Sequence, residues 1–140
     1  MNIWLCPVKP RSWSIIKKVK IFGAPKSVSR VFSQVRPGDL LCFYVLRPIN
    51  RIVAIGKVTS QMFEDHQDIW GKTRYPLRVK IEIEREYLKK NNESLSLSAL
   101  IKAKNPEIEI EPFLKNVWIT KITKRQYARL VDPNDRRTQI

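Results

Sequence analysis

The chain has 140 residues, with 27 lysines and arginines against 13 aspartates and glutamates and a formal net charge of +14. This length suits one domain over residues 1–140, and 43% hydrophobic residues suffice for a core, which excludes a disordered chain. No apolar run approaches the ~20 residues that span a bilayer, and no secretory signal precedes the first strand, so we expect an intracellular protein outside the membrane. The excess positive charge favours a polyanionic partner.

The first half of the chain alternates apolar runs that predict strands with segments of helical spacing. Prolines bound the first strand, and Pro37, Gly38 and Asp39 form a turn before the most apolar run of the chain. Gly56 lies inside the next strand, where a glycine often marks a bulge. The expected elements are a strand at 2–8, a helix at 11–20, a small-residue break at 21–25, a short helix at 27–35, and a hairpin of strands at 40–46 and 51–59.

The second half begins with a polar loop at 61–71 that carries Trp70, followed by a strand at 77–83 in which apolar and charged residues alternate. We expect a helix at 94–104, extended segments at 107–113 and 117–122, and a basic tail at 135–140. Thr123 and Gln126 have the spacing of a capping box at the start of a last helix that ends near Pro133. Short strands with helices between the first two predict a small α+β barrel.

Signals for catalysis are sparse. His66 is the only histidine, and its neighbours Glu64, Asp65 and Asp68 lack the spacing of a calcium loop, so we expect a solvated acidic loop and no metal or other cofactor. The glycines do not form a phosphate-binding motif. Asp39 is expected to accept hydrogen bonds from turn amides. Cys6 and Cys42 lie in apolar runs, which predicts two buried, reduced thiols.

Signals for binding are stronger because cations and rings alternate between residues 13 and 36. Trp13, Phe22 and Phe32 are interleaved with lysines and arginines, a mixture that suits nucleic acid because cations contact phosphates and rings stack on bases. Trp13 and Phe32 have helical spacing with apolar neighbours, so either could belong to the core. Phe22, in the 21–25 break, and Trp70, in the 61–71 loop, are the stronger candidates for a binding surface.

Several short motifs, taken in order, resemble the EVE domain of the PUA-like superfamily, which includes proteins similar to the thymocyte nuclear protein. The resemblance covers most of the chain and rests on Trp4-Leu5, on Phe22-Gly23-Ala24-Pro25-Lys26, on Pro37-Gly38-Asp39 before Phe43-Tyr44-Val45, on Tyr75-Pro76 before Arg78-Val79, and on the Trp118 segment. It implies a twisted barrel of five or six strands with peripheral helices, related to the YTH-type readers of methylated adenine. It also implies a non-catalytic protein that recognises modified bases in DNA or RNA.

The resemblance also suggests a base pocket. Phe22 takes the position where relatives commonly have Trp, and Trp70 would form the opposite wall, so that a flipped base could lie between them. The other expected pocket residues are Trp13, Ala24 and Tyr75. The residues expected to contact phosphates are Lys20, Lys26, Arg30, Arg74 and Arg78, although Arg78 could instead pair with Glu82.

Two other functions remain open at this point. An enzyme accessory or nucleotide hydrolase would use Asp65, His66 or Asp68, and metal-dependent turnover would reveal it. A small-molecule or protein-binding module would use its basic surface only for solubility or anionic partners. The sequence does not choose between RNA and DNA or identify the modification, and it favours a monomer without fixing the oligomeric state.

Overall fold

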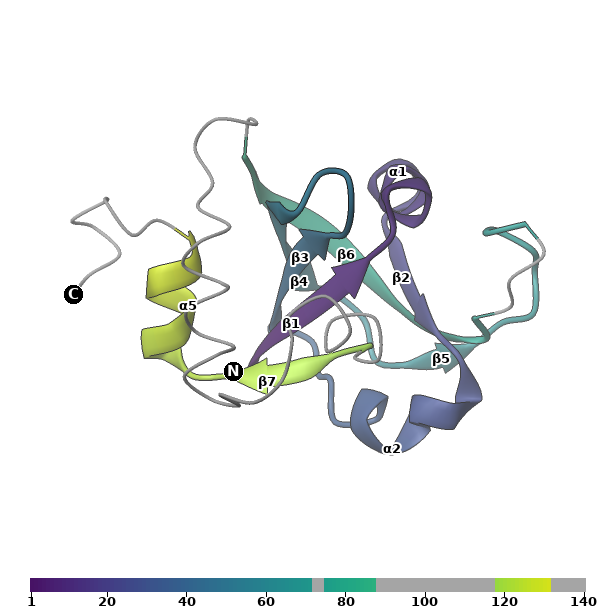
Figure 1. Ribbon diagram of the computed structural model, residues 1–140. Helices are drawn as coiled ribbons and strands as arrows, with labels where there is room; N and C mark the ends of the chain where they lie inside the picture. Colours follow the sequence, from purple (N-terminus) through teal and green to yellow (C-terminus); the bar gives the residue numbers. More distant parts are fainter. Residues whose placement is uncertain (72–74, 88–117, 132–140) are drawn as a thin grey trace.

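The computed structural model describes residues 1–71, 75–87 and 118–131, with the backbone alone for 128–131. Within these ranges seven strands form one mixed sheet in the order β2-β6-β4-β3-β1-β7, and β5 pairs with β6. The sheet curls into a half-barrel (Figure 1). The strands are β1 (Ile3–Val8), β2 (Ile21–Ala24), β3 (Leu40–Val45), β4 (Arg51–Val58), β5 (Phe63–Glu64), β6 (Leu77–Glu86) and β7 (Thr120–Ile122).

β3 lies at the centre of the sheet, and both of its faces are covered. Leu41 and Phe43 point to the larger apolar cluster, whereas Cys42 and Tyr44 point to a second cluster on the opposite face. A strand that is buried on both faces has no solvent-exposed side, which explains why the sequence of β3 has no polar position. β3 pairs in parallel with β1 and antiparallel with β4, so the predicted hairpin is confirmed.

Gly56 marks a bulge, as the sequence predicted. The register between β4 and β6 shifts between Ile55 and Gly56. A Cβ atom on Gly56 would lie 2.9 Å from Cε2 of Phe43, so the absence of a side chain lets this ring pack against β4. The bend that follows helps the sheet to curl.

The segment predicted as a break at 21–25 forms a strand instead. β2 pairs antiparallel with β6, in the register Phe22 to Val79 and Gly23 to Arg78. The loop position expected for Phe22 is therefore wrong: its ring is 1% exposed and packs against Phe32 and Phe43. A four-residue strand that contains Gly23 and Ala24 is too short for its alternation to be visible in the sequence.

The helices lie at the rim of the curled sheet. α1 (Pro10–Val19) connects β1 to β2 and buries Trp13 and Ile16. The predicted helix at 27–35 is reduced to a 3₁₀ turn, η1 (Lys26–Val28), and a short helix, α2 (Ser29–Phe32). On the far side α5 (Lys124–Val131) follows β7, and its residue Tyr127 packs on the second cluster (Figure 1).

The predicted capping box at the start of α5 is confirmed. The backbone N–H of Gln126 donates to Oγ1 of Thr123 at 3.0 Å, and the N–H of Thr123 donates to Oε1 of Gln126 at 2.8 Å. The helix predicted at 94–104, the extended segment at 107–113 and the tail at 135–140 lie outside the described residues. Among the residues that are described, no helix is long and apolar enough to cross a membrane.

Asp39 is buried and accepts three hydrogen bonds, which confirms the role predicted for it. The donors are the indole N–H of Trp4 at 3.0 Å and the backbone N–H groups of Asn2 at 2.9 Å and Arg36 at 3.0 Å. One carboxylate therefore holds the turn before β3, the start of β1 and a core indole together. This arrangement satisfies donors that would otherwise be buried without a partner.

Both cysteines are free and buried, as predicted. Cys6 belongs to the larger cluster and Cys42 to the second, so the sheet separates the two thiols. Burial raises the pKa of Cys42 to about 12 and raises the pKa of Cys6 well above its usual value. A thiol with a raised pKa remains protonated at neutral pH and is a poor nucleophile.

Candidate nucleic-acid interface

A cavity of about 200 Å³ opens where the end of β1, the helix α1 and the strand β2 meet the loop between β5 and β6. β1 and β2 are far apart in the strand order, but the curl of the sheet brings both to this cavity. Its walls are mainly apolar and aromatic. The lining residues are Pro7, Val8, Lys9, Ser12, Ile16, Phe22, Gly23, Leu46, Trp70, Tyr75 and Trp118.

Three aromatic side chains form one continuous cluster in this wall. The ring centroids of Trp70 and Tyr75 are 5.4 Å apart, and those of Tyr75 and Trp118 are 4.8 Å apart. Both pairs meet edge to face, a favourable arrangement that fixes the orientation of the rings. Because Tyr75 contacts both tryptophans, the three rings are preorganised relative to one another before any ligand enters.

Gly23 on β2 allows Trp70 to lie directly against the sheet. A Cβ atom at this position would be 2.6 Å from Cη2 and 2.9 Å from Cζ3 of the Trp70 indole. Such contacts are closer than real side chains permit, so any residue with a side chain would displace the ring. The absence of a side chain in β2 therefore sets the position of one wall of the cavity.

Arg78, which is 2% exposed, anchors the loop that carries Trp70. Its Nε donates to the carbonyl oxygen of Tyr75 at 2.9 Å, and its Nη2 donates to the carbonyl oxygen of Gln67. Its Nη1 lies 3.6 Å from Oδ2 of Asp65, which is an ion pair but too long for a hydrogen bond. The guanidinium carbon lies 5.1 Å from the centre of the Trp70 ring.

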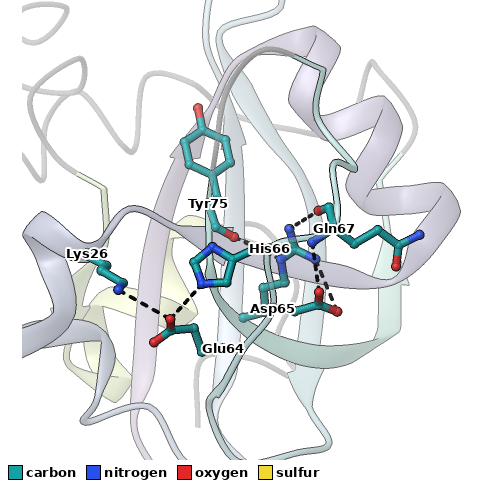
Figure 2. Close-up of polar contacts among 7 residues, drawn as sticks. Lys26, Glu64, Asp65, His66, Gln67 and Tyr75 are labelled. Carbon is teal, nitrogen blue, oxygen red and sulfur yellow. Dashed lines mark hydrogen bonds and ion pairs between the residues drawn. The ribbon is translucent and has the colours of Figure 1, made fainter.

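These contacts tie both ends of the loop to one buried cation. Figure 2 shows the polar groups of Asp65 and Gln67 gathered at this point, with the Tyr75 ring pointing away from them. Arg78 occupies the outer face of β6, as the alternation of this strand requires, but the loop covers it. Because Arg78 is buried, the prediction that it contacts phosphate is wrong. Arg78 forms its ion pair with Asp65 and not with Glu82.

The acidic loop holds an exposed group of charges away from the cavity lining. Oε2 of Glu64 lies 2.8 Å from Nε2 of His66 and 3.4 Å from Nζ of Lys26 (Figure 2). Hydrogen bonds from His66 and then Lys26 lower the pKa of Glu64. Asp65 accepts from the backbone N–H of Gln67 at 2.9 Å. In the part of the chain that the structure describes, no three His, Cys, Asp or Glu side chains could jointly hold a metal ion.

The structure brings together some of the predicted site residues and separates others. Phe22, Trp70 and Tyr75 line the cavity, and the side chains of Phe22 and Trp70 are both buried, at 1% and 6% exposed. Trp13 packs against Phe43 with ring centroids 5.2 Å apart, and Ala24 is fully buried, so both belong to the core. Neither contributes to the lining of the cavity.

The remaining predicted phosphate contacts lie outside the cavity lining. Lys20 and Arg30 are exposed, and Lys26 is exposed but paired with Glu64. Arg74 lies outside the described residues.

Eight lining residues were not predicted as site residues, and three of these have polar or aromatic side chains: Lys9, Ser12 and Trp118. Lys9 is the N-cap residue of α1, and Pro10 marks this helix start in the sequence. Trp118 precedes β7, which pairs with β1 at the edge of the sheet. Its place beside Tyr75 depends on that long-range pairing, and local spacing contains no signal for it.

Solved structures with the same fold include two informative cases. A protein of Rhodopseudomonas palustris has a TM-score of 0.63 at 19% sequence identity, over 93% of this chain and 90% of that protein. The YTH domain of Mmi1, solved in complex with RNA, has a TM-score of 0.67 at 12% identity, over 91% of this chain and 77% of that one. At these low identities the likeness shows a shared fold, the PUA-like fold that the resemblance implied. The described residues form a half-barrel of seven strands, where a barrel of five or six was expected.

Sequence relatives are found in archaea. A UPF0310 protein of Pyrococcus horikoshii is 35% identical over an alignment of 95 residues that covers 59% of this chain and 66% of that protein. A UPF0310 protein of Pyrococcus abyssi is 33% identical over an alignment of 93 residues that covers 58% of this chain and 65% of that protein. The match thus spans slightly less than two thirds of each relative. The model of the EVE domain family matches residues 2–132, so the chain belongs to the EVE domain family.

Proposed function

We propose that this EVE domain is a non-catalytic nucleic-acid-binding module that holds one unstacked base, preferably a modified one, in the aromatic cavity. The observation that carries the proposal is the cluster of Trp70, Tyr75 and Trp118 around a cavity of about 200 Å³. Sites for drug-sized ligands usually measure about 300–1,000 Å³, so this cavity suits one ring system. The net charge of +14 supports a polyanion as the molecule that presents the ring.

The physical chemistry of the walls suits a base. Stacking on aromatic side chains contributes roughly 1–3 kcal/mol per base, which offsets the cost of taking the base out of its stack. A methyl group on the base adds on the order of 0.8 kcal/mol if the cavity removes it from water. Because most of the lining is apolar, a methylated base gains more here than its unmodified counterpart. The proposal covers both RNA and DNA.

The fold comparison also supports nucleic-acid binding. The YTH domain of Mmi1 shares this half-barrel and was solved in complex with RNA. The proposal for the present chain nevertheless rests on its own rings and charge.

Substitution of the two tryptophans tests the proposal. Trp70→Leu and Trp118→Leu keep apolar bulk but remove the stacking faces, and each is expected to weaken binding of short oligonucleotides roughly 5- to 150-fold. The probes are single-stranded RNAs and DNAs with one central methylated or unmodified base, followed by fluorescence anisotropy. Tyr87→Leu is the matched control, because Tyr87 is a buried aromatic residue of the opposite face.

The control variant should lose stability but retain affinity. Thermal melting of every variant separates loss of the fold from loss of the pocket. Affinities of both tryptophan variants within twofold of the unmodified protein, for every probe that it binds, would refute the pocket. Binding that does not change with salt concentration would instead favour a small-molecule or protein-binding module.

A further inference from the structure

A second hollow adjoins the aromatic cavity and shares a wall with it. It measures about 490 Å³ and lies between the first turn of α1 and the loop that carries Trp70. Lys9, Ser12, Trp70 and Tyr75 line both spaces, and Arg11, Ile15 and Gly71 line the second alone. A ligand that fills the aromatic cavity and continues past its rim would therefore enter this hollow.

The hollow is open and positively charged. Lys9 and Arg11 are both exposed, and within the described residues neither side chain is paired with a carboxylate. The first turn of α1 contains no acidic residue. Lys17, further along the same helix, is by contrast engaged with Glu86 at 2.6 Å. The two cations of the hollow thus remain available to an anion from outside the chain.

Arg11 lies close to the loop of Trp70. Its Nη2 lies 3.7 Å from the point where a Cβ atom on Gly71 would be. Gly71 has φ +78°, in the left-handed region that glycine adopts readily, so the loop can turn here without a side chain between the guanidinium and the hollow. The guanidinium and the Trp70 indole thereby contribute to the same hollow.

We infer that this hollow binds the phosphodiester group that adjoins the captured base, with Lys9 and Arg11 as the contacting cations. The inference rests on the proposed function and makes it more specific: the ligand is a nucleotide within a strand, not a free base or nucleoside. A base, its sugar and its phosphate form one covalent unit in which a flat ring is joined to an anion. The two adjoining spaces match this order: three rings surround the first, Lys9 lines both, and Arg11 lines the second alone.

The two cations would act differently on the phosphate. The guanidinium of Arg11 can donate two parallel hydrogen bonds to phosphate oxygens, and the Lys9 ammonium supplies a compact charge. An acidic peptide could satisfy the cations, but its carboxylates have no flat ring attached that would occupy the adjoining aromatic cavity at the same time.

Charge-removing variants test the inference. Lys9→Gln, Arg11→Gln and the double variant are titrated with short single-stranded oligonucleotides and with the corresponding free nucleosides at several salt concentrations. Lys18→Gln is the matched control, because Lys18 is exposed on the same helix and lines neither space. We expect each single variant to bind oligonucleotide roughly fivefold to tenfold more weakly at low salt.

The salt dependence provides a second readout. The log–log slope should become shallower by about 0.7 for each phosphate that is no longer neutralised. Because both cations contact one phosphodiester group, we expect a change of about 0.7 in the double variant and a part of that change in each single variant. Lys18→Gln should leave the slope unchanged, and Arg11→Gln should not alter nucleoside binding, because Arg11 lines the second hollow alone. A polyglutamate peptide serves as a competitor, and we expect it to compete poorly with the oligonucleotide.

Failure of the phosphate site can be distinguished from failure of the base pocket. Unchanged slopes for Lys9→Gln and Arg11→Gln, in a protein whose oligonucleotide binding still depends on Trp70, would refute the phosphate site and leave the base pocket intact. Nucleoside binding as tight as oligonucleotide binding would do the same. Effective competition by polyglutamate would show an unspecific anion site and overturn the inference. Absence of binding by both nucleosides and oligonucleotides would overturn the proposed function together with the inference.

Discussion

Gly23→Ala is the smallest change that the structure predicts to alter the pocket. The added methyl group would meet Cη2 of Trp70 at 2.6 Å, whereas ordinary contacts begin at 3.4 Å, so the indole must retreat by about 0.8 Å. The tyrosine beside it is also close, because Cβ of Tyr75 lies 3.0 Å from the same point. Overpacking of this kind costs about 1–3 kcal/mol, which corresponds to a fall in Tm of roughly 3–10 °C.

The same displacement should reduce oligonucleotide affinity, because Trp70 forms a wall of the cavity. Gly56→Ala is the control: it creates a similar close contact, 2.9 Å to Cε2 of Phe43, but Phe43 is not among the lining residues. Differential scanning calorimetry and anisotropy titrations measure the two effects. Both variants should melt earlier, and Gly23→Ala alone should bind more weakly. Equal affinity of the two variants would refute the claim that β2 positions Trp70.

Three further predictions concern buried polar groups. Arg78→Lys should lower stability by about 2 kcal/mol and accelerate amide hydrogen exchange in the loop of Trp70, because the single Nζ of lysine cannot take the positions of both Nε and Nη2, which bond the two loop carbonyls; unchanged exchange would contradict this. Asp39→Ala leaves three donors without their acceptor and should cost about 3 kcal/mol in urea denaturation, and a loss below about 1 kcal/mol would contradict the role assigned to it. Cys42 ionises near pH 9 when unfolded but only near 12 when folded, so it should make stability fall as pH rises across this interval, by up to about 1.4 kcal/mol per pH unit. Urea denaturation of Cys42→Ala should show a correspondingly smaller fall, and an identical pH profile would contradict the assignment.

Local patterns in the sequence predict most of the described elements. The alternation in β6, the fully apolar β3, the turn at Asp39 and the capping box of Thr123 and Gln126 each follow from interactions within a few residues or from the period of the structure. The strand β2 escapes prediction because four residues with Gly23 and Ala24 show neither helical nor strand period. Only its pairing with β6 makes this segment a strand.

The site is less predictable because it is built from distant segments. The resemblance suffices to place Trp70 and Tyr75 in the pocket, but the third ring, Trp118, arrives through the pairing of β7 with β1. The alternation of β6 predicts that Arg78 lies on the solvent-exposed face of this strand, and the structure does place the residue on the outer face. The loop that folds back over Arg78 cannot be inferred from that alternation, and this loop converts an exposed cation into a buried anchor.

The central claim, that one base enters the aromatic cavity, is tested most directly by the tryptophan indole N–H resonances. The chain has four tryptophans, and Trp70 and Trp118 line the cavity whereas Trp4 and Trp13 do not, although Trp70 belongs to the same buried apolar cluster as those two. In a titration of ¹⁵N-labelled protein with an oligonucleotide that carries one methylated base, the resonances of Trp70 and Trp118 should shift strongly and those of Trp4 and Trp13 should barely move. Binding that leaves the Trp70 and Trp118 resonances in place would contradict the account.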